Sequence, residues 1–408
     1  MRTLSCDAGR LYRDGGFPGD PWDREPLVSA GPAAEFLAEL HPPFRYPRPI
    51  DRAALDGAYA GALELMELVN HEGRTGAACG LFRVPGATLR DGVVYLARGS
   101  ETCILYETHR PIDRPTLAPV TADVLANGPV TAIGGLALYL GSAGSFNYGH
   151  WIVDDLSRQA AFSSLRVLHP RAPITVVVDA FEPKVDAIRR QSLDLILGLE
   201  QGFEIRFVPR GETVAFEDLH YASPTTQHPL LKSPEALRGL AALLRRRTRG
   251  ERLALARRRL GDDLAGGRLP RLRRRLYVER RAGRSRPLVN EAEVAALLAE
   301  HGFEGIDPET LTFASQVARF AEAGIVVGPM GAAMTTSVVC APGTHVVHLA
   351  HEGWTDPFFW DLACVMGHRF SAVYGRAEGP GTLYRPYAID LDALRRRLRA
   401  VLGPLTSR

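Results

Sequence analysis

The stretch that decides the fold runs from Gly144 to Gln159 and reads Gly-Ser-Phe-Asn-Tyr-Gly-His-Trp-Ile-Val-Asp-Asp-Leu-Ser-Arg-Gln. Asparagine is a frequent helix cap, and acidic residues in the first turns suit the helix dipole, so the pattern predicts a helix that starts near Asn147. In such a helix His150, Asp154 and Arg158 lie four residues apart and share one face. The stretch therefore places an imidazole, a carboxylate and a guanidinium in one polar row.

An apolar run from Ala132 to Leu140 precedes this row and predicts a buried strand. A polar row at the end of a buried strand suits a catalytic or binding site. It equally suits a solvated helix face that carries i,i+4 pairs. Val153, Leu156 and Ala160 fall on another face and are expected to pack inward.

The pattern Asn147-Tyr-x-His150-Trp-x-x-Asp154 resembles the asparagine-histidine-aspartate motif of glycosyltransferase family 61, which includes bacterial capsular-polysaccharide transferases. The resemblance covers about residues 132–370. It implies an α/β fold of the GT-B type, with two Rossmann-like domains facing a cleft. It also implies an inverting transfer of a hexose or pentose from a nucleotide-diphosphate sugar, expected to be UDP-linked, to a glycan hydroxyl.

Length and composition limit the class of protein. The 408 residues are too many for one compact core and suit two domains of ordinary size. Hydrophobic residues make up 46% and charged residues 23%, which is typical of a soluble globular chain. The formal charge of +3 gives no electrostatic case for nucleic acid as a partner. Nearly all basic residues are arginines, because Lys184 and Lys232 are the only lysines.

Cysteine usage and targeting features indicate a reducing compartment. The five cysteines are scattered and contain no Cys-x-x-Cys, so neither a disulfide framework nor a zinc site is expected. The N-terminus has no apolar core of a signal peptide. The uncharged run from Gly324 to Gly343 contains proline, threonines and glycines, which favours a buried strand-turn-helix over a membrane span. We expect a cytoplasmic protein, with room for peripheral association at the inner face of the membrane.

The first 120 residues are expected to form an N-terminal extension. Residues 1–50 are rich in proline, glycine and charge, and predict irregular structure. Residues 53–69 predict a short helix, and residues 79–106 predict a small antiparallel β region ahead of the main fold. Residues 121–250 then alternate between strand and helix, with a helix expected over 234–247. This alternation predicts a first Rossmann-like domain that binds the acceptor.

The second half of the chain repeats this alternation. Residues 251–274 continue an arginine-dense stretch and are expected to be a linker, where the arginines form either a solvated face or a surface for a lipid-linked acceptor. Residues 275–389 predict a second Rossmann-like domain for the sugar nucleotide. Its helices are expected over 290–300, with Asn290 as the cap, and over 313–321, and a strand is expected over 345–349. Residues 390–408 predict a terminal helix capped by Asp390.

A second candidate block follows the strand Leu276-Tyr277-Val278. Ligands bind at the carboxyl ends of strands in open α/β sheets, and guanidinium groups beside a helix N-terminus suit a diphosphate. The spacing resembles the family's tyrosine-x-x-arginine, arginine, and asparagine-glutamate pattern. The residues expected to bind substrate here are Arg280, Arg284, Arg286, Asn290 and Glu291.

The third block is a glycine turn from strand to helix, Gly328-Pro-Met-Gly331-Ala-Ala-Met-Thr335-Thr336. Such a turn exposes backbone N–H groups to an anion. It resembles the family's glycine-x-histidine-glycine-alanine loop, with Met330 where the family usually has histidine and His348 later where a glutamate is common. The substrate-binding residues expected here are Gly328, Met330, Gly331, Ala332 and Thr335.

Two further polar motifs lie outside these three blocks. Asp390-Leu-Asp392 fits the Asp-x-Asp pattern of metal-dependent transferases, but it opens a helix, so capping is the expected role. His228 follows a predicted strand and is expected to face the cleft as a substrate-binding residue. No metal or protein-bound cofactor is expected, because arginines take the place of a metal's charge on the leaving group.

These residues give three hypotheses of function. In the first, Asp154 is the base for the acceptor hydroxyl, His150 orients it, and Asn147 binds substrate; His150 as base is the second choice, since its unperturbed pKa is about 6.5. In the second, motivated by Met330 and His348, the chain is a degenerate transferase that binds nucleotide or glycan without turnover. The third, a nicotinamide-dependent oxidoreductase, conflicts with the absence of Gly-x-Gly-x-x-Gly.

Overall fold

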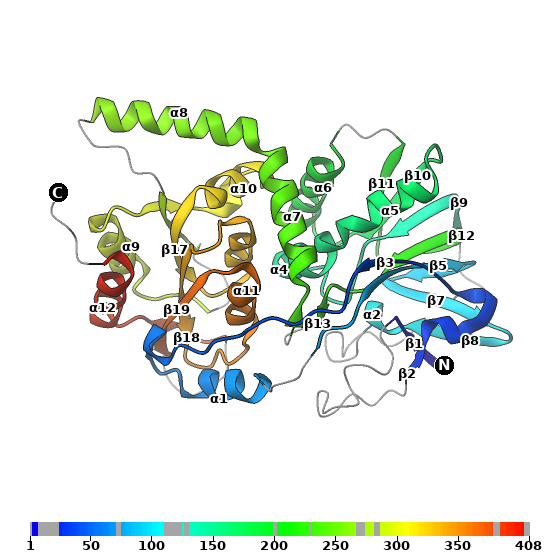
Figure 1. Ribbon diagram of the computed structural model, residues 1–408, viewed down its shortest axis with the longest axis horizontal. Helices are drawn as coiled ribbons and strands as arrows, with labels where there is room; N and C mark the ends of the chain where they lie inside the picture. Colours follow the sequence, from blue (N-terminus) through cyan, green and yellow to red (C-terminus); the bar gives the residue numbers. More distant parts are fainter. Residues whose placement is uncertain are drawn as a thin grey trace. The chain divides into compact units, whose positions relative to one another are not determined.

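The structure is a computed structural model that describes residues 2–6, 24–70, 75–109, 125, 130–198, 202–227, 231–266, 274–280, 286–377 and 384–403. The chain forms two compact units, each assembled from two segments. Unit 1 is Met1–Arg45 with Thr75–Gln227, and unit 2 is Tyr46–Arg74 with His228–Arg408. Each unit contains its own sheet with helices packed against it, so the expected mixed α/β class is confirmed (Figure 1).

The sheet of unit 1 is built around four parallel strands. Their order is β11-β10-β9-β12, so β9 lies in the middle and leads directly into the stretch that begins at Gly144. In β9 only Ile133 and the last three residues, Ala137–Tyr139, are buried, in contrast to the buried strand that the sequence predicts. The strands are β9 (Val130–Tyr139), β10 (Ile174–Asp179), β11 (Phe203–Val208) and β12 (Thr213–Ala222), and the helices that connect them are α5 (Ala160–Leu168) and α6 (Pro183–Leu197).

Antiparallel strands extend this sheet beyond β12. β5 (Cys79–Pro85) and β6 (Thr88–Arg90) both pair with β12, and β3 (Glu35–His41) pairs with β5. The predicted antiparallel strands over residues 79–106 are therefore confirmed, but they are part of the main sheet and do not lie ahead of the main fold. The outer strands are β7 (Val93–Arg98), β8 (Glu101–Leu105), β1 (Arg2–Ser5) and β2 (Arg24–Pro26), and β8 leads into the short helix α2 (Tyr106–His109).

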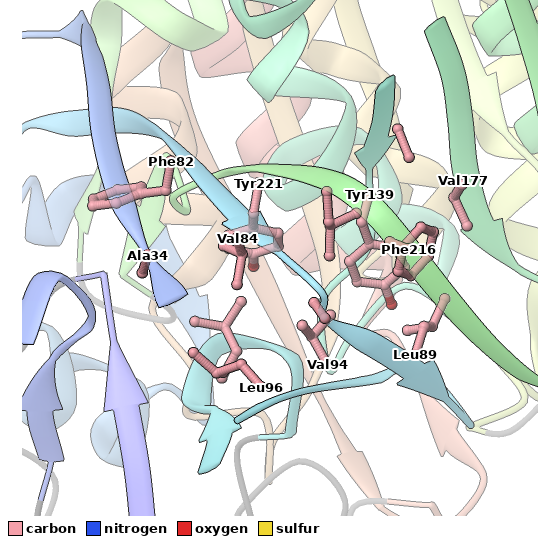
Figure 2. Packing of buried hydrophobic residues seen from close by; sticks show 14 of the residues in the cluster. Ala34, Phe82, Val84, Leu89, Val94, Leu96, Tyr139, Val177, Phe216 and Tyr221 are labelled. Carbon is pink, nitrogen blue, oxygen red and sulfur yellow. The ribbon is translucent and has the colours of Figure 1, made fainter. Parts of the chain in front are cut away.

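The core of unit 1 explains why these strands join. Figure 2 shows Val84, Leu89 and Val94 from β5, β6 and β7 gathered with Phe216 and Tyr221 from β12. All five side chains are buried. Alternate residues of a strand point to one face of its sheet, so the apolar face of the antiparallel strands and that of β12 are covered together.

The sheet of unit 2 is parallel in the order β16-β15-β17-β18-β19, with β20 antiparallel at one edge. Helices α9 and α12 cover one face with a shared apolar cluster, and α10 and α11 lie on the other side (Figure 1). The strands are β15 (Arg274–Val278), β16 (Glu304–Ile306), β17 (Ala323–Pro329), β18 (His345–His351), β19 (Arg369–Ala377) and β20 (Tyr387–Ala388). The helices are α9 (Glu291–Glu300), α10 (Phe313–Ala321), η6 (Ala332–Val339), α11 (Phe358–Met366) and α12 (Leu391–Leu402).

An early segment of the chain completes unit 2. β4 (Leu55–Gly57) pairs in parallel with β19, and α1 (Ala60–Val69) follows it. At Gly57, φ is +81° and an added Cβ would lie 2.0 Å from the Tyr374 carbonyl oxygen, so glycine permits this pairing. Part of the expected N-terminal extension thus belongs to the C-terminal sheet. The single helix predicted over residues 53–69 is a strand and a shorter helix.

Two further helices of unit 2 precede its first strand in the sequence. α7 (Pro234–Arg247) has the predicted bounds and is capped by the Ser233 hydroxyl. α8 (Arg249–Ala265) is a helix over much of the expected linker 251–274, and residues 267–273 of that linker lie outside the described residues. The compact units divide at Gln227, whereas the sequence places the end of the first Rossmann-like domain at residue 250. Among the described residues, no helix is long and apolar enough to cross a bilayer.

Candidate functional site

The predicted helix after β9 is interrupted by a π-helical turn. α4 (Tyr148–His150) is capped by the Asn147 side chain, which accepts from Gly149 N–H at 2.8 Å. The next residues form a π turn, η3 (Trp151–Asp155), in which Leu156 N–H reaches back five residues to the Trp151 carbonyl. A 3-10 turn, η4 (Leu156–Gln159), precedes α5. π turns inside helices occur often at functional sites, because the extra residue re-aims the side chains that follow.

The π turn separates the polar row that the sequence predicts. Nδ1 of His150 lies 2.6 Å from Oδ2 of Asp154, so this i,i+4 pair forms. The His150 side chain is 25% exposed and the Asp154 side chain is 11% exposed. An added Cβ at Gly144 would lie 2.8 Å from Cγ of His150, so the missing side chain at Gly144 makes room for the imidazole. The pair is a half-buried imidazole held by a carboxylate.

Arg158 does not share this face, and the prediction that it does is wrong. It is fully buried and pairs with Asp155, while one of its N–H groups donates to the Ala222 carbonyl at 3.0 Å. The guanidinium lies 5.2 Å from the centre of the Tyr221 ring, and Ser145 donates to Asp155 at 2.7 Å. The extra residue of the π turn shifts the register, so the arginine meets the neighbouring aspartate inside the unit.

Three hydroxyl groups converge on one carbonyl of the π turn. Ser157 donates to the Val153 carbonyl at 2.5 Å, Thr226 donates at 3.2 Å and Thr225 at 3.4 Å. The two threonines follow β12, so the end of this strand is fastened to the turn that carries Asp154. Satisfied backbone groups of this kind hold an irregular turn in one conformation.

A second cluster of predicted residues lies after β15 in unit 2. Glu291 accepts from the Arg280 backbone N–H at 2.8 Å and from the Tyr277 hydroxyl at 3.2 Å. Glu291 therefore fixes the chain as it leaves the strand. Asn290 precedes α9 without a side-chain capping bond, contrary to expectation. Its amide instead donates to the Ile389 carbonyl and accepts from Ile389 N–H, at 2.8 and 3.1 Å.

Arg286 and Arg280 form a concentration of like charge. Burial and the neighbouring Arg280 charge lower the pKa of Arg286 below its usual range. Arg286 adopts φ of +60° and its guanidinium lies 4.2 Å from the centre of the Trp354 ring. Among the described residues, no carboxylate forms an ion pair with Arg286. Two guanidinium groups close enough for their charges to interact favour binding of an anion with more than one charge.

The glycine turn lies beside these arginines. An added Cβ at Gly331 would lie 3.4 Å from an Arg280 guanidinium nitrogen, and one at Gly328 would lie 2.7 Å from the Met334 sulfur. The strand does not stop at Gly328, because β17 continues to Pro329 and Met330 N–H donates to the Leu349 carbonyl at 2.8 Å. Met330 is buried. Its backbone thus extends the pairing with β18.

The remaining predicted residues have different surroundings. Ala332, half-buried, opens η6, and the Thr335 hydroxyl is buried without a hydrogen-bond partner among the described residues. His348 is buried between Phe359 and Phe370, with ring centres 4.7 and 5.4 Å away. Arg284 and His228 lie outside the described residues.

Sequence reasoning missed several residues that shape these clusters. The buried role of Asp155 is one of them: the sequence predicts only that acids suit the first turns of this helix, although neighbouring positions such as Asp154 and Asp155 face different ways on a helix. Trp354 and His351 follow the predicted end of β18 at Leu349, and extending the strand by two residues would have placed them at its carboxyl end. The pairing partner of Arg158 gave no local signal, because it depends on the π turn.

Two other features of unit 2 involve none of the residues predicted to bind substrate. A shallow cavity of about 410 Å³ is lined by Tyr59, Leu63, Glu64 and Glu67 around the start of α1. Its acidic side chains do not suit a diphosphate. Asp390 accepts from the N–H groups of Asp392 and Ala393 at 2.8 and 3.3 Å, so the expected cap of α12 is confirmed. Within the described part of the chain, no group of three or more His, Cys, Asp or Glu residues is placed to hold a metal ion.

One family of known proteins matches a stretch of the chain that includes residues of both clusters. Residues 148–347 match the model of a protein family described as Glycosyltransferase 61. The matched stretch contains His150, Asp154, Arg280, Arg286 and Gly331. None of the curated proteins compared with the chain matches it. Over this stretch, which is just under half of its length, the chain is similar to glycosyltransferase family 61, and this similarity supports glycosyltransferase activity.

Proposed function

We propose that the chain is an inverting glycosyltransferase that moves a hexose or pentose from a UDP-linked sugar to a hydroxyl of a glycan or lipid-linked glycan. One observation carries the proposal: the stretch similar to family 61 contains both a half-buried His150–Asp154 pair and the adjacent arginines Arg280 and Arg286. We further propose a GT-B division of labour, in which unit 1 binds the acceptor and unit 2 the donor.

The reaction requires two kinds of group. The acceptor hydroxyl loses a proton to a base as its oxygen forms a bond to the anomeric carbon. The bond from that carbon to the phosphate oxygen breaks, and its electron pair leaves with the nucleoside diphosphate. Positive groups aimed at the leaving phosphates stabilise the charge that develops there.

The His150–Asp154 pair is the base in this proposal. Sequence reasoning favours Asp154 as proton acceptor and His150 as the second choice. The geometry supports His150 Nε2, because Nδ1 already engages Asp154 and the imidazole is the more exposed of the two side chains. Asp154 then orients the ring and stabilises the imidazolium, as carboxylates paired with a catalytic histidine do.

Arg280 and Arg286 receive the leaving diphosphate, together with the N–H groups at the start of η6 near Gly331. Because these cations lie where a metal's charge would otherwise be needed, the proposal includes transfer without a metal ion. Arg284 belongs to the same block of sequence and is proposed to act with them.

The cellular setting is proposed from the family resemblance and from α8. Capsular-polysaccharide transferases resemble the chain, so we propose a role in bacterial surface polysaccharide synthesis at the cytoplasmic side of the membrane. Leu253, Leu260 and Leu264 are exposed on α8 among its arginines. Exposed leucines with arginines suit an anionic lipid surface. Co-sedimentation with phosphatidylglycerol vesicles should fall in a triple Leu253→Ser, Leu260→Ser, Leu264→Ser variant, and unchanged binding would contradict this role.

A panel of UDP-, GDP-, ADP- and dTDP-sugars tests the activity. We expect one UDP-sugar to raise the melting temperature and to release UDP slowly by hydrolysis, and faster when a glycan acceptor is added. Release should continue in excess chelator, so a complete loss that added metal reverses would contradict metal independence. Binding without any release of nucleotide would favour the degenerate binding protein. Failure to bind any of the sugar nucleotides would contradict the transferase.

A further inference from the structure

His351, the last residue of β18, is a buried imidazole that the proposed reaction has not used. It is 4% exposed. Its Nδ1 accepts a hydrogen bond from the Gly353 backbone N–H at 2.9 Å. Its Nε2 is buried and has no hydrogen-bond partner among the described residues.

The bond from Gly353 determines which ring nitrogen carries the proton. Nδ1 accepts a hydrogen bond, so it has no hydrogen of its own. In the neutral ring the proton is therefore on Nε2, which makes Nε2 a donor. Burial and the charge of Arg286 lower the pKa of His351, although Glu352 opposes them, so the neutral form is favoured. His351 is thus a buried N–H donor that has no acceptor in the part of the chain that the structure describes.

The position of this donor is at the carboxyl edge of the sheet beside the arginines. β17 and β18 are paired up to Pro329 and Leu349, so Gly331 and His351 are each two residues beyond the last pair. Arg280 lies against Gly331. Arg286 is near enough to shift the pKa of His351, and it covers Trp354, three residues further along the chain.

A buried donor without an acceptor is costly, and the cost is recovered when a ligand supplies the acceptor. Two guanidinium groups outnumber the one carboxylate near this donor, that of Glu352, which already accepts from Ala377 N–H at 2.8 Å, so an anion with several acceptor oxygens is favoured over a cationic ligand. A diphosphate has both properties. A neutral imidazole N–H adds a directional bond to the charge that the two guanidinium groups provide.

We propose that His351 Nε2–H donates a hydrogen bond to a phosphate oxygen of the nucleoside diphosphate, as a third binding group beside Arg280 and Arg286. This inference rests on the proposed function, because it assigns one more residue to the diphosphate site of unit 2. It gives His351 a part in both donor binding and departure of the leaving group.

The test compares two substitutions of His351 that distinguish its role as a donor through Nε2 from its role in the turn, where Nδ1 accepts from Gly353 N–H. His351→Asn keeps a side-chain oxygen that can accept from N–H two residues ahead, as asparagine does in turns, but its amide is too short to replace Nε2. His351→Gln places an amide donor further out. Isothermal titration with UDP and with inorganic pyrophosphate measures affinity, and thermal unfolding checks the fold. His345→Asn is the matched control, since His345 lies at the opposite end of β18 and contacts Ser371.

We expect His351→Asn to bind both UDP and pyrophosphate at least about ten-fold more weakly, as loss of a hydrogen bond to a charged group requires. His351→Gln should recover part of the affinity, and His345→Asn should bind like the wild type. Unchanged affinity in a folded His351→Asn variant, with Arg280→Ala weakened, would overturn this inference and leave the proposed function standing. Failure of the wild type to bind either ligand would overturn both.

Discussion

At the scale of single residues, Asp154 and Asp155 are adjacent but have opposite surroundings. Asp154 holds a half-buried imidazole. Asp155 is fully buried, paired with Arg158 and hydrogen-bonded by Ser145. A carboxylate that shares its charge with a buried arginine supports the fold, whereas one that holds an accessible histidine is suited to proton transfer.

This contrast predicts a loss of stability in Asp155→Asn. The substitution leaves the Arg158 charge buried without a counter-ion, so the free energy of unfolding should fall by about 3–5 kcal/mol. Urea unfolding followed by circular dichroism measures it. Asp392→Asn, which removes an exposed partner of Arg395, is the control and should change stability little. Equal stability of the two variants would mean that the Asp155–Arg158 pair does not hold the turn.

The buried histidines of unit 2 predict how stability depends on pH. Burial lowers the pKa of His348 to about 3 and that of His368 to about 4, compared with about 6.5 in an unfolded chain. At a pH between the folded and the unfolded pKa of a histidine, that histidine is protonated in the unfolded chain but not in the folded chain. Stability should therefore fall as the pH drops from about 6.5 to about 4, by about 1.4 kcal/mol per pH unit for each histidine.

His348→Phe is the variant that tests this origin. Phenylalanine keeps the aromatic packing against Phe359 and Phe370 but cannot take up a proton. Urea unfolding at several pH values gives the slope of the free energy of unfolding against pH. In the variant this slope should be smaller by the contribution of about one proton. A slope identical to that of the wild type would show that His348 does not contribute.

At the scale of elements, helix ends were predictable where a local cap fixes them. α7 and α10 have the predicted bounds, and Ser233 and Thr312 cap them from the preceding residue. Asp390 caps α12 in the same way. The π turn was not predictable, because its cause is tertiary: hydroxyls of Thr225 and Thr226, some 70 residues away, hold the Val153 carbonyl.

Which strands pair with one another could not be predicted from the local sequence either. β4 pairs with β19, more than 300 residues later in the sequence, and β5 pairs with β12. Periodicity shows which face of a strand is buried, but not against which strand it lies. The positions of Arg280 and Gly331 were predictable, since both follow parallel strands, whereas the stacking of Arg286 on Trp354 depends on the turn after His351.

The docking of the early segment on α11 predicts a further stability effect. Asp361 is fully buried and accepts from Lys232 and from the Tyr46 hydroxyl, each at 2.7 Å. Asp361→Asn should lower the free energy of unfolding by about 3–5 kcal/mol, because the Lys232 charge loses its partner. The double variant Lys232→Met, Asp361→Leu should recover part of this loss in urea unfolding, since the buried Arg48 guanidinium, 3.5 Å from Asp361, still loses its partner. A double variant less stable than Asp361→Asn would contradict the role of the pair.

At the scale of the whole molecule, each compact unit consists of two separate segments of chain. The residues from Tyr46 to Arg74 belong to unit 2, although unit 1 residues precede and follow them. No single cut therefore separates the two units. The expected boundaries at residues 120 and 250 are based on local patterns along the chain. Such patterns do not show that residues 46–74 join unit 2.

The proposed division of labour, with the donor bound by unit 2, predicts which residues determine the affinity for nucleotide. Arg280→Ala and Arg286→Ala should each weaken UDP binding in isothermal titration, by about 1.5–3 kcal/mol for the charge-assisted hydrogen bonds lost. Arg395→Ala, on the exposed face of α12, is the control and should bind UDP normally. Full affinity in both cluster variants would show that these arginines are surface residues.

The most direct test of the proposed mechanism is turnover of Asp154→Asn on the sugar nucleotide that the wild type uses. The substitution keeps the shape of the side chain but removes the carboxylate that engages His150. If the pair takes the acceptor proton, turnover should fall by about 10²–10⁴ while UDP affinity, which depends on unit 2, stays the same. A folded Asp154→Asn protein with nearly full turnover would contradict the account, because the pair would then support only the helix.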